Sequence, residues 1–246
     1  MTAGGRWTVA MVDTPALLRL EIETGWMTDA DGRLVRSRTP EWRRVPWLTV
    51  GAGAGGLCWA LSSELPAALA TPVADVLAAT APPHATPAVG WAPGPAGRLL
   101  DLLADAGALR APSRGPAYLV PSVLRGHDGV ELVPGGEGDE ERLRGMLPER
   151  DRTSLLVPWT VALVDGQVAA VCETARSAPT SVEAGVWTYE PYRRRGLAAA
   201  VTAAWSAQVA ERTAFYSTSD DNLASQGVAR RLGLRPLGQW WSVYAA

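Results

Sequence analysis

Three consecutive arginines precede a glycine and a run of small residues in VWTYEPYRRRGLAAA, residues 186–200. A predicted strand ends at Thr188, and Gly196 opens a predicted helix. The first N–H groups of a helix lack partners within it and carry the positive end of its dipole, so arginines there repel the helix unless an anion binds. The segment therefore predicts a phosphate-binding site, against the plainer interpretation of a solvated helix terminus.

A second polar segment, SDDNLASQGVARRLGL, spans residues 219–234. Its aspartates or Asn222 can cap the helix that follows, and Gly233 can end that helix. Asn222 is the only asparagine of the chain, although aspartate would cap equally well. Two interpretations stay open: a helix cap alone, or a specific contact made by the side-chain amide.

A glutamate in the middle of an apolar strand is the candidate general base. Val182, Ala184 and Val186 alternate with Glu183, so its carboxylate faces the opposite side of the sheet. A carboxylate placed there can accept a proton, directly or through water. The alternatives are a glutamate exposed at a sheet edge, and Glu173 on the preceding strand as the base.

The elements that must position these residues alternate between strands and helices. A two-residue Asp165-Gly166 turn predicts a hairpin, and leucine or alanine spacing predicts the helices. The expected fold class is α/β (α+β), with the sheet covered by helices. Strands are expected at 159–164, 167–174, 181–188, 214–218 and 239–244, and helices at 139–146, 197–212 and 223–232.

The first half of the chain is rich in proline and glycine and carries no comparable motif. It predicts two strands, 48–50 and 57–61, around a glycine turn, and a strand at 118–120. Helices are expected over 64–79, where Pro72 should break the helix, and over 98–109. The polar stretch 125–139 is the best boundary. We expect an N-terminal α+β domain of unknown role at 1–125 and a second domain at 126–246.

Together the two motifs resemble the GNAT superfamily of acetyl-CoA-dependent N-acetyltransferases. Arg193-x-x-Gly196-x-Ala198 is similar to that family's pyrophosphate loop, and the segment from Asn222 to Leu234 is similar to its later helix. The resemblance covers about residues 126–246. It implies a mixed, mostly antiparallel sheet flanked by helices, and the first half is then either a degenerate second GNAT-like unit or an unrelated cap.

The resemblance also implies which residues bind acetyl-CoA or another acyl-CoA. Backbone amides of residues 194–199 hold the pyrophosphate, the end of strand 181–188 pairs with the pantetheine arm, and one N–H of that strand polarises the thioester carbonyl. The cofactor-binding set is Val186, Trp187, Thr188, Arg193, Arg194, Arg195, Gly196, Leu197, Ala198, Ala199, Asn222 and Ser225.

The implied reaction is direct transfer of an acyl group to a primary amine, which enters between the strands of Glu183 and Tyr216. Many family members carry a tyrosine acid at the position of Ala229. Tyr216, Ser217, Ser219 or water must replace it. Alternatives are an acyltransferase that takes its donor from a carrier-protein thioester, and a non-catalytic CoA-binding module.

The composition limits the classes of molecule that the protein is expected to bind. The chain has 246 residues and a formal charge of −2, which disfavours nucleic acid and a polybasic membrane contact. All 23 basic residues are arginine, as is typical of a GC-rich bacterial genome. We expect a cytoplasmic protein with a small-molecule amine acceptor, a possible homodimer, buried free thiols at Cys58 and Cys172, and no metal site. Trp240 or Trp241 could line the acceptor pocket.

Overall fold

The computed structural model describes residues 13–39, 44–121, 124, 130–147 and 156–246. In chain order the elements are α1 (Thr14–Gly25), β1 (Trp26–Thr28), β2 (Leu34–Ser37), β3 (Leu48–Gly53), β4 (Gly56–Leu61), α2 (Ala67–Ala78), α3 (Ala96–Ala104), β5 (Ser113–Val120), β6 (Glu131–Gly135), α4 (Glu140–Met146), β7 (Trp159–Val164), β8 (Gln167–Ser177), β9 (Ser181–Thr188), the 3-10 helix η2 (Glu190–Tyr192), α5 (Leu197–Gln208), β10 (Thr213–Ser217), α6 (Leu223–Leu232) and β11 (Arg235–Val243).

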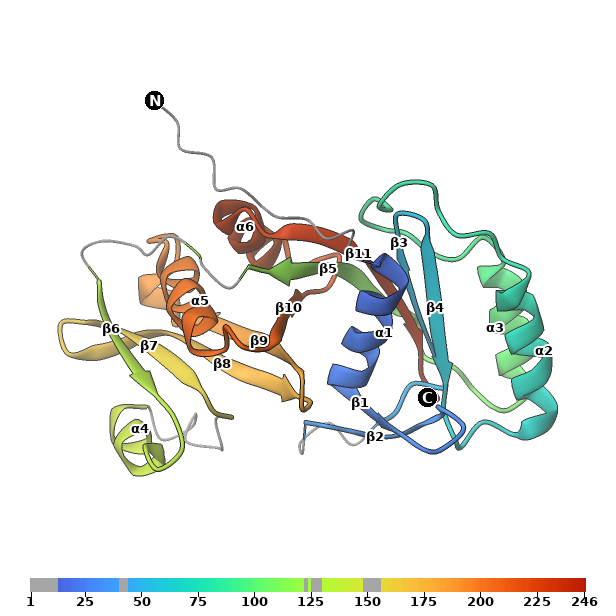
Figure 1. The fold of residues 1–246 in the computed structure, drawn as a ribbon, viewed down its shortest axis with the longest axis horizontal. Coiled ribbons are helices and arrows are strands. Elements are labelled where there is room, and N and C mark those ends of the chain that lie inside the picture. The colour runs from blue at the N-terminus through green and yellow to red at the C-terminus, as the bar shows by residue number, and fades with distance from the viewer. Residues whose placement is uncertain (1–12, 40–43, 122–123, 125–129, 148–155) are drawn as a thin grey trace.

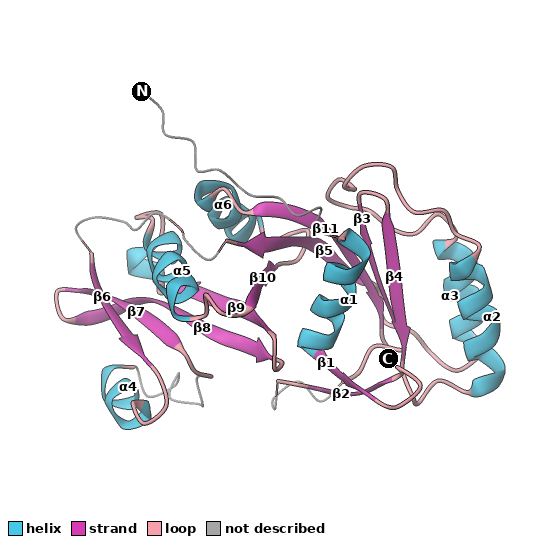
Figure 2. Ribbon diagram, viewed as in Figure 1, coloured by secondary structure: helices cyan, strands magenta, loops and turns pink. Residues whose placement is uncertain are grey.

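One large sheet forms the centre of the molecule (Figures 1 and 2). Its strand order is β4-β3-β11-β5-β10-β9-β8-β7-β6, and β1 and β2 form a separate hairpin. Within the described residues β9 and β10 are parallel, whereas the other neighbouring strands of this sheet pair antiparallel. The expected mixed, mostly antiparallel sheet flanked by helices is therefore confirmed.

Helices cover both faces of the sheet because its strands alternate between two apolar sides. Val182 and Tyr216 belong to the core beneath α5 and α6, whereas Phe215, the neighbour of Tyr216, packs with α1 on the other face. Farther along the sheet, Trp241 packs in the core that holds α2 and α3. Glu183 follows Val182 on β9, so its side chain points to the opposite face of the sheet, which is the face that α1 covers.

The parallel strands β9 and β10 separate partway along their length. Their register runs from Thr213 opposite Ser181 to Phe215 opposite Glu183 and goes no further. Beyond that point β9 continues to Thr188, paired only with β8, and β10 continues to Ser217, paired only with β5. A gap therefore opens between residues 184–188 of β9 and the end of β10.

Strand β5, from the first half of the chain, lies in the middle of the sheet. It pairs antiparallel with β10 on one side and with β11 on the other. The sheet therefore continues across the two domains expected from the sequence, although the expected boundary at 125/126 lies outside the described residues. The division into domains and the idea of a degenerate second unit both remain predictions.

Several sequence expectations agree with the structure residue by residue. The strands at 159–164 and 181–188 and the helix at 223–232 have the expected bounds, and the glycine turn joins β3 to β4. Both cysteines are free and buried, as expected. The helix expected at 197–212 ends earlier, at Gln208, and α2 contains Pro72 without being interrupted. None of the described helices is long and apolar enough to span a membrane.

Candidate active site

The glycine-arginine loop and the start of α5 form a helix terminus with unpaired backbone N–H groups. Arg194 and Gly196 both adopt left-handed backbone conformations, with φ of 62° and 81°. Glycine takes this conformation freely, and here it turns the chain directly into the helix. Ala200 donates to the Gly196 carbonyl at 3.2 Å, whereas the N–H groups of residues 194–199 make no backbone hydrogen bond within the described structure. Successive free N–H groups at a helix start fit a pyrophosphate.

The three arginines of this loop are exposed around that terminus. Arg195 lies over the ring of Tyr192, with 5.8 Å from its guanidinium carbon to the ring centroid. Arg193 reaches back toward the Thr188 carbonyl, 3.4 Å away. The arrangement leaves positive charge next to free N–H groups, as the phosphate interpretation requires.

The strand end expected to meet the pantetheine arm borders the gap in the sheet. Val186, Trp187 and Thr188 pair with β8 on one side and have no β10 partner on the other. The β10-facing edge of this strand is therefore open to an extended ligand. Leu197, Ala198 and Ala199 follow in the first turn of α5, so the structure brings the expected loop and strand end to one end of the gap.

Asn222 caps α6, because its Oδ1 accepts the Ser225 N–H at 3.0 Å. The cap interpretation of this asparagine is therefore confirmed, and its side chain is exposed, which leaves the amide nitrogen accessible. The hydroxyl of Ser225 lies 2.7 Å from the hydroxyl of Tyr216, which is 1% exposed. Desolvation raises the pKa of Tyr216 to about 12, although the hydrogen bond with Ser225 opposes this shift.

Glu183 lies on the face of the sheet opposite to Tyr216, in a polar cluster that joins β8, β9 and β10. Its residue exposure is 4%, its Oε2 forms an ion pair with Arg176 at 2.7 Å, and its Oε1 accepts a hydrogen bond from Ser217. A register shift between Thr174 and Arg176 places Arg176 opposite Glu183 in the β8–β9 pair. Both carboxylate oxygens of Glu183 are therefore engaged.

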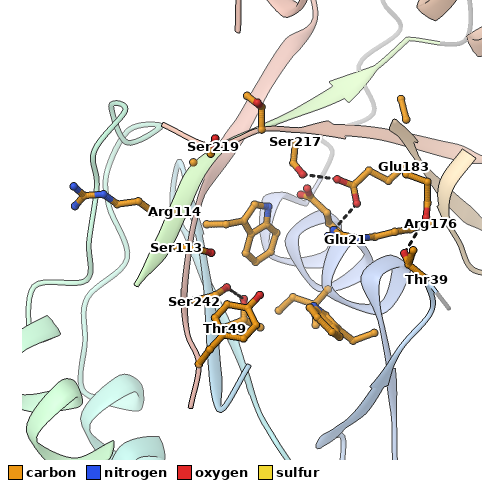
Figure 3. Close-up of a pocket in the computed structure, with 18 of the residues that line it drawn as sticks. Glu21, Thr39, Thr49, Ser113, Arg114, Arg176, Glu183, Ser217, Ser219 and Ser242 are labelled. Carbon is orange, nitrogen blue, oxygen red and sulfur yellow. Dashed lines mark hydrogen bonds and ion pairs between the residues drawn. The ribbon is translucent and has the colours of Figure 1, made fainter. Parts of the chain in front are cut away.

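The cluster opens into a cavity of about 520 Å³ (Figure 3). Its lining mixes charged, hydroxyl, aromatic and aliphatic side chains and comes from eight elements and the segments that connect them: Glu21, Ile22, Trp26, Thr39, Thr49, Ser113, Arg114, Gly115, Leu156, Glu173, Ala175, Arg176, Glu183, Ala184, Ser217, Thr218, Ser219, Trp240, Ser242 and Tyr244. Most of these elements belong to the first half of the chain or to β11, and neither region carries the motifs found in the sequence.

Glu21, on α1, is the main residue that the sequence reasoning missed. Its residue exposure is 5%, and its Oε2 has no hydrogen-bond partner among the described residues. Burial raises its pKa well above the usual value, and the charge of Glu183 raises it further. Trp240 and Arg176 partly oppose the shift. One sequence signal could have indicated that Glu21 is buried. The residues three and four positions before it, Leu18 and Leu17, are apolar and lie on the same side of a helix.

Trp240 lines the cavity, whereas Trp241 is buried in the core beneath α2 and α3. One of the two was expected there. Trp240 pairs with Gly51 of β3, and a Cβ on that glycine would lie 2.1 Å from the indole ring. A glycine at this position lets the ring lie directly on the strand.

The remaining residues considered as general base or general acid lie in different places. Glu173, the alternative base, lines the cavity and accepts the Leu156 N–H at 2.9 Å. Ser219 also lines the cavity, with its hydroxyl bonded to Asp221. Ala229 is fully buried in the α5–α6 core, so α6 offers no hydroxyl at that position. Among the described residues, no cluster of three or more His, Cys, Asp or Glu side chains could hold a metal.

Comparison with known protein families identifies this region. Residues 160–244 match the family model described as GNAT acetyltransferase. This C-terminal region, which contains the separating strands β9 and β10 and the start of α5, therefore belongs to the GNAT superfamily. A comparison with curated proteins finds no match.

Three solved structures are among those similar to the chain. An acetyltransferase of the GNAT family from Novosphingobium aromaticivorans shares 20% identity over 56% of this chain and 66% of that one, with a TM-score of 0.43. A GCN5-related N-acetyltransferase from Kribbella flavida shares 21% over 60% and 63%, with a TM-score of 0.43. A GCN5-related N-acetyltransferase-like protein from Streptococcus suis shares 15% over 81% and 84%, with a TM-score of 0.45. The chain spans less than two thirds of the first two.

Proposed function

We propose that the protein transfers an acyl group, acetyl in the simplest case, from acyl-CoA directly to a small-molecule primary amine. One observation carries this proposal. The gap between β9 and β10 has an anion-binding helix terminus at one end and a cavity with buried carboxylates on the opposite face from α5. A donor with a phosphate at one end and a thioester at the other fits this arrangement.

The donor side consists of contiguous pieces of the C-terminal region. The N–H groups of residues 194–199 would bind the pyrophosphate, with the exposed arginines adding positive charge. The open edge of Val186–Thr188 would hydrogen-bond the pantetheine arm, and Asn222 and Ser225 would border it from α6. The bound donor supplies an activated acyl group, and a strand N–H would stabilise the oxyanion formed on attack.

Direct transfer is favoured over an acyl-enzyme intermediate. Burial raises the pKa of the Cys172 thiol, and Cys172 lies within the α5 core. Burial also raises the pKa of Cys58 to about 12. A thiol that holds its proton so tightly is a poor nucleophile, so the amine itself must attack the thioester.

The leaving thiolate needs a proton, and Tyr216 is the proposed donor. Its pKa of about 12 keeps the phenol protonated at neutral pH, and Ser225 holds its hydroxyl beside the first turn of α6. Tyr216 and Glu183 occupy opposite faces of the sheet. Proton donation would therefore occur on the donor side and proton uptake on the acceptor side. Ser217, hydrogen-bonded to Glu183, is the alternative donor.

The experiment is an assay of CoA release from acetyl-CoA over a panel of small amines, with Glu183→Gln as the test variant. Loss of the charged partner of Arg176 at the cavity is expected to lower kcat/KM by about 100-fold or more. The dissociation constant for acetyl-CoA should not change. Glu211→Gln, an exposed glutamate after α5, is the matched control. Equal activity in wild type and Glu183→Gln would contradict the proposal.

One observation favours a second candidate, a non-catalytic CoA-binding module. Ala229 is fully buried where many family members carry the tyrosine acid, so α6 cannot donate a proton there. Micromolar binding of acetyl-CoA with no turnover of any amine in the panel would support this alternative. Turnover that depends on Glu183 would exclude it.

A further inference from the structure

Glu21 is an acidic side chain on the buried face of an otherwise apolar helix surface. On α1 the buried residues are Leu17, Leu18, Glu21, Ile22, Thr24 and Gly25, which recur at helical spacing. The apolar members pack against β3, β4 and β11. The same face turns Glu21 toward the cavity that Glu183 also lines (Figure 3).

The position of Glu21 costs stability, because a buried carboxylate oxygen without a partner loses its hydration without replacement. Its Oε2 has no hydrogen-bond partner among the described residues. Packing does not require a charge here, since glutamine has nearly the same shape. Unfavourable buried polar groups are found where function needs them.

The two buried carboxylates of the cavity differ in what they can still accept. Glu183 has Arg176 on one oxygen and Ser217 on the other. Glu21 lines the same cavity, and its buried Oε2 has no hydrogen-bond partner among the described residues. Building on the proposed function, we propose that Glu21 binds the ammonium group of the acceptor and takes its proton, while Glu183 is a positioning residue that holds Arg176 and Ser217.

The charges around Glu21 suit this role. Burial and the neighbouring charge of Glu183 raise its pKa, which gives it a higher proton affinity than a solvated glutamate. Arg176 forms its ion pair with Glu183 and offsets only part of the charge of Glu21 when Glu21 is ionised. A cationic amine would offset the rest, so amine binding and ionisation of Glu21 are coupled.

The proton balance of the transfer follows from this assignment. One N–H bond of the ammonium breaks and its proton passes to Glu21, which frees the nitrogen lone pair. The amine then forms the C–N bond at the thioester carbonyl, and the C–S bond breaks as the tetrahedral intermediate collapses. Tyr216, the proposed donor, gives its proton to the thiolate and is reprotonated from solvent, which takes up the second nitrogen proton, and Glu21 returns its own proton to solvent. The products are an amide, CoA thiol and one released proton.

The cavity also limits the acceptor class. Its volume of about 520 Å³ is in the range of small-molecule sites, and hydroxyl groups such as those of Thr49 and Ser242, which bond each other at 2.8 Å, line it. Trp26, Trp240 and Tyr244 supply aromatic surface. The matching acceptor is a small primary amine that carries hydrogen-bonding groups of its own.

The test compares Glu21→Gln with Glu23→Gln, an exposed glutamate on the same helix. With an amine that the wild type acetylates, we expect Glu21→Gln to lower kcat/KM by about 100-fold or more and to remove the acidic limb of its pH profile. Glu23→Gln should retain both. Glu183→Gln should lower the rate but keep the acidic limb, because Glu21 remains as the proton acceptor. The acetyl-CoA dissociation constant should be the same in all four proteins.

The outcomes separate this inference from the proposed function. Turnover by wild type with an unchanged pH profile in Glu21→Gln overturns the role of Glu21 and leaves the acyltransferase proposal standing. If the wild type turns over no amine, the acyltransferase proposal fails, and a titration with 2-aminoethanol tests Glu21 separately. Binding with proton release in wild type, and its loss in Glu21→Gln, supports the carboxylate as an ammonium site. Equal binding in both proteins overturns it.

Discussion

The proposed donor side and the proposed acceptor side of the gap are built in opposite ways. The proposed donor side consists of a loop, a strand end and a helix cap within residues 186–225, and it offers mostly backbone N–H groups. The proposed acceptor cavity is lined by residues from α1, β1, β3, β5, β8, β9, β10 and β11. A helix terminus is specified locally, whereas a cavity of this kind exists only after the two halves of the chain have paired.

This difference explains why a family motif marks the proposed donor side, whereas we expect the acceptor cavity to determine which amine is used. Backbone atoms bind a common donor, and any sequence that folds into the loop and helix supplies them. The side chains of the proposed acceptor cavity come from both regions: Arg176, Glu183 and Ser217 lie within the family match, whereas Glu21, Thr49 and Arg114 lie outside it. We therefore expect the first half to contribute to the choice of acceptor.

The largest expected effect comes from removing the first half. Residues 126–246 alone lack β5, so β10 and β11 would lose the strand that lies between them. We expect no cooperative thermal unfolding of this fragment by circular dichroism, in contrast to the full chain. A synthetic peptide of residues 111–121, which contains β5, should restore some structure. A fragment that unfolds cooperatively by itself would show that the domain boundary expected at 125/126 is real.

The sequence predicted the elements around the proposed donor site well because their signals are local. A hairpin turn, an alanine-rich helix and a glycine after arginines identify β7 to α5 without any tertiary information. The expected Glu183 orientation followed from alternation alone, and the structure places that side chain away from α5 as expected.

The acceptor side could not be predicted in the same way. Pairing of β5 between β10 and β11 joins residues more than 90 positions apart, and no periodicity encodes it. The partner of Glu183 depends on a register shift in β8 that places Arg176 opposite it. Glu21 was missed because α1 itself was not predicted, and the hairpin of β1 and β2 was missed with it.

An intermediate effect is expected on the donor side from replacing Arg193, Arg194 and Arg195 together by glutamine. Because these side chains are exposed, each contributes little, and we expect acetyl-CoA to bind about 10-fold more weakly at low salt. The difference should shrink as salt is raised, whereas Arg98→Gln, an exposed arginine on α3, should bind as wild type does. Unchanged affinity would point to the carrier-protein donor, with the arginines docking the carrier.

The smallest expected effect is a change of stability with pH on the acceptor side. Because the pKa of Glu21 is raised in the folded state, folding takes up a proton between pH 4.5 and that raised value. Stability is therefore lost as pH rises through this range. Glu21→Gln should match wild type near pH 4 and have the higher Tm at pH 8. Parallel Tm curves for the two proteins would contradict a buried, uncompensated carboxylate at this position.

The proposed reaction requires a CoA site at the start of α5, so the decisive measurement is calorimetric titration of acetyl-CoA into wild type, Gly196→Glu and Gly233→Glu. Both glycines have positive φ, 81° and 63°, so backbone strain is similar, but Gly196 starts α5 and Gly233 ends α6. We predict micromolar binding, about −8 kcal/mol, to wild type and Gly233→Glu, and none to Gly196→Glu. Equal binding to all three proteins, or none to wild type, would contradict a CoA site at the start of α5.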